Sequence, residues 1–118
     1  MKSVNAARRG RVGALAAMLL VQAPQVGKAE LLADVYGRTL GAASQCAAVG
    51  RDRLDHVATI AAAHLKTLPP PPGGEAAIGA RLTDAMARGG RDVASGAVTC
   101  AQAESELGNL EHDLGPGS

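Results

Sequence analysis

The chain has 118 residues, of which 12 are lysine or arginine and 11 are aspartate or glutamate. This length suffices for one domain, and because phenylalanine and tryptophan are absent, its core must consist mainly of aliphatic side chains and alanine. Five basic residues and no acidic residue precede Glu30, so the rest of the chain is acidic. An acidic domain does not attract a phosphate backbone, which argues against a nucleic-acid partner.

Residues 1–29 have the pattern of a secretory signal peptide. A basic segment, residues 2–11, precedes an uncharged apolar run, residues 12–21, which is shorter than the roughly 20 residues of a membrane-spanning helix. Small residues predict cleavage after Ala29, with cleavage after Ala23 as the alternative. The competing interpretations are a twin-arginine signal, a basic nucleic-acid-binding arm and a retained signal anchor. We expect a periplasmic or secreted protein with no membrane segment after cleavage.

The first helix of the exported domain is predicted over residues 31–48. Its apolar face repeats at helical spacing and comprises Leu32, Tyr36, Thr39, Leu40, Ala43, Cys46 and Ala47. Gly37 and Gly41 lie beside this face, four residues apart, where they would let another helix approach closely. Gly50 is expected to end the helix.

A second helix is predicted over residues 52–68, with Asp52 as its N-cap. Its apolar face comprises Leu54, Val57, Ala61, His64, Leu65 and Leu68. Four prolines and two glycines follow at residues 69–74, where no helix can continue, so they predict a short connector. The alternative interpretation of the proline run is a ligand for an aromatic groove.

The third predicted helix covers residues 75–94, with a bend or frayed segment expected at Gly89 and Gly90. Its inward residues are predicted to be Ile78, Leu82, Ala85, Met86, Gly89 and Val93.

A capping box predicts the start of the fourth helix, because Thr99 precedes Gln102 by three residues. Its apolar stripe comprises Cys100, Ala103, Leu107, Leu110 and Leu114. Residues 115–118 are expected to form a disordered tail.

Four amphipathic helices and no strand pattern predict an all-α domain over residues 30–114, either a small four-helix bundle or a pair of helical hairpins. Cys46 and Cys100 both lie on apolar stripes, and export would place them in an oxidising compartment, so we predict one disulfide between them. A bridge across that loop should stabilise the domain by about 4 kcal/mol. Without export, the two residues would remain buried thiols.

The sequence contains no haem-attachment, redox, phosphate-binding or hydrolase motif, so we expect neither enzymatic activity nor a cofactor. His56 and His64 are weak candidates for a metal site. They are eight residues apart on one helix, so their rings diverge by about 80°. His112 is far along the chain, and we interpret His56 as solvent-exposed and His64 as lying at the edge of the apolar stripe, with neither binding a metal.

The segments Leu40–Asp55 and Ser95–Glu111 resemble parts of small exported two-cysteine helical proteins of proteobacteria that have no assigned activity. The resemblance covers about a third of the chain and rests on the two cysteine neighbourhoods. It implies an exported helical domain with one bridge, and it supplies no catalytic residue. In size and single-bridge plan the chain is also similar to small acid-stress periplasmic chaperones, but it matches none of their motifs.

These observations predict an exported, non-enzymatic protein that binds another protein or itself. An alternative is an acid-stress holdase, because eleven carboxylates face seven basic residues after position 29 and the charge would invert on acidification. A small-ligand or metal carrier is a third hypothesis.

Overall fold

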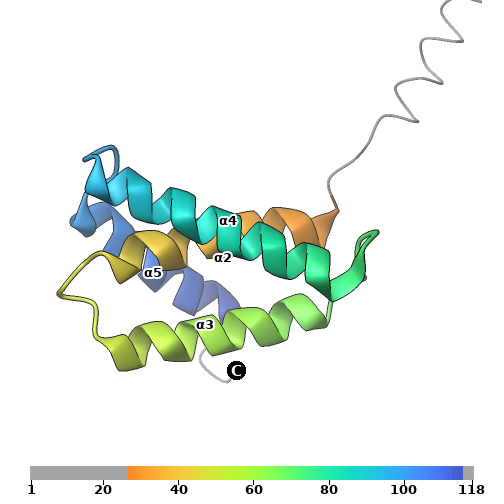
Figure 1. Cartoon of the computed structure of the whole chain (residues 1–118). Helices are drawn as coiled ribbons and strands as arrows, with labels where there is room; N and C mark the ends of the chain where they lie inside the picture. The colour runs from red at the N-terminus through yellow and green to blue at the C-terminus, as the bar shows by residue number, and fades with distance from the viewer. Residues whose placement is uncertain (1–26, 116–118) are drawn as a thin grey trace, which may run out of the picture.

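The computed structural model describes residues 27–115, which form four α-helices and no strand (Figure 1). The helices are α2 (Lys28–Ser44), α3 (Arg51–Lys66), α4 (Gly74–Ala94) and α5 (Cys100–Leu114). The all-α prediction is therefore confirmed. The predicted apolar run at residues 12–21 and most of the predicted tail lie outside the described residues.

The helix α2 is the centre of the fold. It packs against α3, α4 and α5, whereas α4 makes only marginal contact with α3 and α5. The pairing of Glu30 with Arg81 and the approach of Gln45 to Gly90 show that α2 and α4 run parallel. Both α3 and α5 start beside the end of α2 and run back along it, so the helices alternate in direction along the chain (Figure 1).

Glycines let α2 and α4 approach to backbone contact. A Cβ atom added at Gly37 would lie 2.6 Å from the Cβ of Ala85, and one added at Gly41 would collide with the backbone of Met86. Gly89 of α4 meets the backbone of α2 in the same way. The prediction that Gly37 and Gly41 admit a second helix is confirmed, and that helix is α4.

The connection between α2 and α3 differs from the prediction. The helix α2 ends at Ser44, and Cys46 lies in the turn that follows, where its N–H donates to the carbonyl of Ala43 at 3.0 Å. Gly50 does not end α2 but is the N-cap of α3, and Asp52 lies in the first turn of that helix. The extended backbone of Gly50 and the bond from the N–H of Leu54 to its carbonyl start the new helix.

In α4, two further details differ from the prediction. The helix continues through Gly89 and Gly90, because contact with α2 holds Gly89 in place and offsets its cost of about 1 kcal/mol in a helix. Met86, predicted to face inward, is 38% exposed, because it presents its backbone and not its side chain to Gly41.

The predicted capping box of α5 is confirmed. The N–H of Gln102 donates to Thr99 Oγ1 at 3.1 Å, and the N–H of Thr99 donates to Gln102 Oε1 at 2.9 Å. Two amide groups near the helix start are thereby satisfied, which places the beginning of α5 at Cys100.

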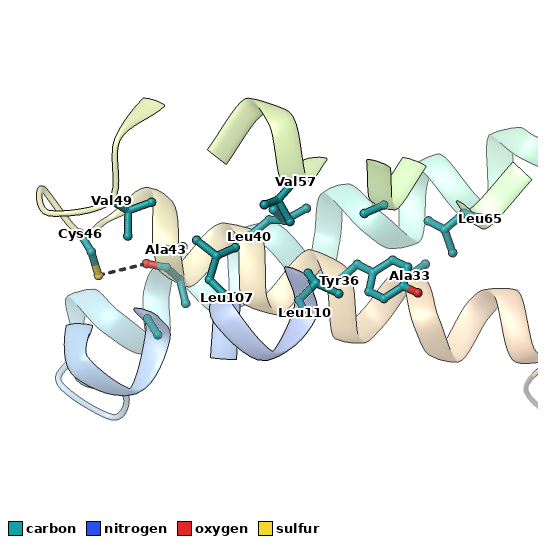
Figure 2. Packing of buried hydrophobic residues seen from close by; sticks show 13 residues of the cluster. Ala33, Tyr36, Leu40, Ala43, Cys46, Val49, Val57, Leu65, Leu107 and Leu110 are labelled. Carbon is teal, nitrogen blue, oxygen red and sulfur yellow. Dashed lines mark hydrogen bonds between the residues drawn. The ribbon is translucent and has the colours of Figure 1, made fainter. Parts of the chain in front are cut away.

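The apolar core lies where α2 faces α3 and α5. Figure 2 shows its larger side chains, which converge from these three helices: Tyr36, Leu40, Val57, Leu65, Leu107 and Leu110. Alanines such as Ala33, Ala43 and Ala103 fill the positions between them. No helix among residues 27–115 has the length and apolar character needed to cross a membrane.

The predicted disulfide joins Cys46 to Cys100, with their Cα atoms 5.6 Å apart. It ties the turn after α2 to the first residue of α5, at the end of the domain opposite the proline connector (Figure 1). A covalent link across 54 residues compensates for a core in which alanine buries little apolar area.

Replacement of Gly41 by alanine should destabilise the domain by about 3 kcal/mol, because the new Cβ would collide with the backbone of Met86 and force α2 and α4 apart. Urea unfolding followed by circular dichroism measures the change. The matched control is Gly79→Ala, also in α4, where a Cβ meets no atom within 4 Å and stability should rise by up to about 1 kcal/mol. Equal effects of the two substitutions would contradict the close contact.

Replacement of both cysteines by alanine should lower the free energy of unfolding by about 4 kcal/mol, since the unfolded chain then regains the entropy of the closed loop. The measurement is urea unfolding of the oxidised protein and the double variant under identical conditions. A loss well under 1 kcal/mol would show that the bridge contributes little.

Candidate binding groove

An apolar groove of about 340 Å³ lies between the end of α3 and the first turns of α4. Its lining residues come from α2, α3, the connector and α4: Ala29, Ala62, Leu65, Lys66, Leu68, Pro70, Glu75, Ile78, Gly79 and Leu82. The groove exists because α4 lies along α2 and makes only marginal contact with α3. The apolar side chains of α3 and α4 consequently flank a space that no other described element fills.

The groove is apolar inside and charged at its edge. Leu65 and Leu68 form one wall and Ile78 and Leu82 the other, and all four are part of the core or packed against it. Lys66 and Glu75 are the only ionisable residues of the lining, and both are exposed. A site with this lining can hold an apolar group through burial.

The proline connector forms one end of the groove. Pro70 contributes to the lining, and the carbonyl of Pro71 accepts a bond of 2.9 Å from the N–H of Gly74. Gly73 and Gly74 have φ angles of +93° and +65°, which only glycine adopts readily, and they turn the chain into α4. The sequence indicated the connector but not that it would line a site.

Ion pairs attach the first half of α4 to α2. Arg81 binds both oxygens of Asp34, from Nε at 3.0 Å and from Nη2 at 3.1 Å, and its Nη1 lies 3.1 Å from Glu30 Oε2. Arg88 Nη2 approaches Asp34 Oδ1 at 3.5 Å. The hydrogen bond to Asp34 is the main reason that the pKa of Arg81 is raised. Arg81 is 47 residues from Asp34 and 51 residues from Glu30 in the chain, so no local sequence pattern indicates the pairing.

The histidine candidates occupy different places. His64 lies against Tyr36, with ring centroids 6.3 Å apart. His56 is exposed and lines a second hollow together with His112, because α3 and α5 lie side by side there. His56 and His112 therefore lie around the same hollow although they are far apart in the chain. Among residues 27–115, no three histidine, cysteine, aspartate or glutamate side chains group closely enough to hold a metal ion.

An ion pair between α3 and α5 lies at the second hollow. Arg53 of α3 donates from Nε to Glu111 Oε1 at 3.0 Å, and a second bond joins its Nη2 to the same oxygen. This hydrogen bond is the main reason that the pKa of Arg53 is raised. Glu111 is thus held by Arg53, beside His56 and His112.

No family model, curated protein or solved structure matches this chain. A proposal of function for this domain therefore depends on the geometry of the groove. Its large apolar surface and exposed charged rim are typical of sites that bind apolar groups by shape.

Tyr36, the only tyrosine in the chain, should titrate above its usual pKa of 10.0, because burial and then the charge of Asp113 oppose its ionisation. Absorbance titration of tyrosinate measures this directly. Asp113→Asn should lower the pKa only part of the way, since burial is the larger cause, and Asp92→Asn in α4 should not change it. The resulting stability is present below about pH 10 and is lost as pH rises through the folded-state pKa. A pKa of 10 or lower would contradict the buried position.

Proposed function

We propose that this chain is an exported, non-enzymatic binding module that holds an apolar segment of a partner protein in the groove between α3 and α4. The observation that carries the proposal is the groove itself, with leucine and isoleucine walls and charge only at the rim. The chain offers no catalytic motif, which favours binding over chemistry.

The size of the groove indicates how much of a partner it can take. A cavity of about 150 Å³ admits a molecule such as benzene, so 340 Å³ fits roughly two aliphatic side chains. An amphipathic helix presents such a pair at positions i and i+4. Burying two of them contributes about 1.5–3 kcal/mol each, against the cost of association, so we expect a weak and reversible complex.

Export is supported by the covalent framework. A disulfide persists in the periplasm or outside the cell and is rare in the reducing cytosol. The predicted signal peptide agrees with such a location. Cleavage after Ala29 would fall inside the first turn of α2, while the alternative after Ala23 precedes the described residues.

A second candidate function is that of an acid-stress holdase. Glu30, Asp34 and Glu111 each carry an ion pair between two helices, so protonation of these carboxylates would weaken contacts that hold the helices together. Apolar surface released in that way could bind unfolded proteins. Protection of an aggregating client at pH 3 and not at pH 7 would support this function, and its absence would exclude it.

Ile78→Asp should weaken binding of an amphipathic peptide by about tenfold or more, because it places a charge in the apolar wall. The probe is a fluorescent helical peptide with leucines at i and i+4 and neutral polar residues elsewhere, and anisotropy measures its affinity for protein purified from the periplasm. Ala80→Asp, an exposed site on the same helix, is the matched control and should bind like the unchanged protein. Binding that is indifferent to Ile78→Asp would overturn the proposal.

A further inference from the structure

The first half of α4 is one wall of the groove, and the way it is attached differs from the rest of the helix. Every close glycine contact between α2 and α4 involves Leu82 or a later residue of α4. Before Leu82, the polar links to α2 are those of Arg81 with Asp34 and Glu30. The groove wall that Ile78 and Leu82 form therefore lies next to the ion pairs that Arg81 makes with α2.

We propose that Arg81, Asp34 and Glu30 form an ionic latch that sets the width of the groove, and that loss of the two carboxylate charges releases the first half of α4. The latch regulates the site on which the proposed function rests. Its release moves Ile78 away from Leu65 and opens the groove to a larger apolar segment.

The position of Arg81 gives the latch direct control of the wall. Arg81 is adjacent to Leu82 and three residues after Ile78, so all three lie within about one turn of α4. A helix turn moves as a unit, because its backbone hydrogen bonds join residues four apart. Displacement of Arg81 from α2 therefore displaces Ile78, one turn before it, while the backbone of Leu82 stays against Gly37.

Besides these ion pairs, this half of α4 is held by the apolar packing of Ile78 and Leu82 against the core. Across the groove α3 makes only marginal contact with it, and no ion pair joins α3 to α4 within residues 27–115. At its start, Gly73 and Gly74 link α4 to the connector through a turn rich in glycine. From Leu82 onwards, the backbone contacts with Gly37 and Gly41 keep the remainder of α4 on α2 and provide the pivot.

The neighbouring charges strengthen the response to protonation. On α4, Arg88 approaches Asp34 at 3.5 Å and Asp84 at 3.3 Å. Arg81 and Arg88 therefore share Asp34 as a partner on α2, and both would lose its negative charge if Asp34 were neutral. The other ionisable groups on elements around this stretch of α2 include Lys28, Tyr36 and Arg38 on α2 itself, Glu75 on α4, His64 and Lys66 on α3, and Asp113 on α5. None of these groups forms an ion pair with Glu30 or Asp34 in the part of the chain that the structure describes.

Acidification supplies the change in charge. Protonation of the two carboxylates would remove their negative charges, whereas arginine keeps its positive charge. The latch is therefore closed at neutral pH and released as the pH falls through the acidic range.

Hydrogen exchange with mass spectrometry tests the latch without any partner. The variant Glu30→Gln/Asp34→Asn keeps the size of both side chains and removes their charge. At pH 7 its amides in residues 74–82 should exchange about fivefold faster than those of the unchanged protein, with α5 unaffected. Arg81→Gln, which removes the cation and leaves both carboxylates, should give the same local pattern.

The matched control is Glu111→Gln, which breaks the ion pair between α3 and α5 and leaves the latch intact. It should not change exchange in residues 74–82. Unchanged exchange in both latch variants would overturn the proposal. Faster exchange spread evenly over all four helices would also overturn it, because that pattern reports global destabilisation.

An apolar dye that fluoresces on burial links the latch to the groove. At pH 7 the charge-neutral variant should bind about threefold more dye than the unchanged protein. Adding Ile78→Asp to that variant should remove the gain, since it alters the wall itself. A gain that survives Ile78→Asp would place the dye elsewhere and overturn the link.

The latch and the proposed function fail in different ways. Local exchange that responds to the latch variants, with no peptide binding, would refute the binding function alone. Peptide binding that depends on Ile78, with exchange that ignores the latch variants, would refute the latch alone.

Discussion

Backbone contact between α2 and α4 determines how the remaining helices can be arranged. At Gly41 and Gly89 each helix meets the main chain of the other, which is possible only because neither residue has a side chain. This contact places α4 along one side of α2, while the core with α3 and α5 occupies another. The helix α4 lies against α2 and makes only marginal contact with α3, and the apolar groove is the space between α3 and α4.

The two ends of the domain are held by different forces. At one end, the bridge from Cys46 to Cys100 links the turn after α2 to α5 covalently. At the other end, α4 starts from a proline and glycine connector and is attached to α2 by the ion pairs of Arg81. The groove lies at this second end, beside Ala29 in the first turn of α2. The proposed binding site therefore lies at the end of the domain that no covalent bridge holds.

The composition of the domain fits a binding role of this kind. With no phenylalanine or tryptophan and one tyrosine, the core gains limited stability from burial, and the disulfide compensates for this. The larger aliphatic side chains are shared between the core and the groove walls, as at Leu65. A ligand in the groove would extend the same apolar cluster, which links binding to the stability of the domain.

The sequence by itself determined the helical class, the number of helices after residue 27, the cysteine pair and the capped start of α5 at Thr99. These features depend on neighbouring residues or on a single possible pairing, so local patterns suffice. Other features required the tertiary structure, namely the groove, the pairing of Arg81 with Asp34, and the placement of His56 and His112 around one hollow. Each of these depends on which helix faces which across long stretches of chain, and an apolar stripe shows only that a face is buried, not what buries it.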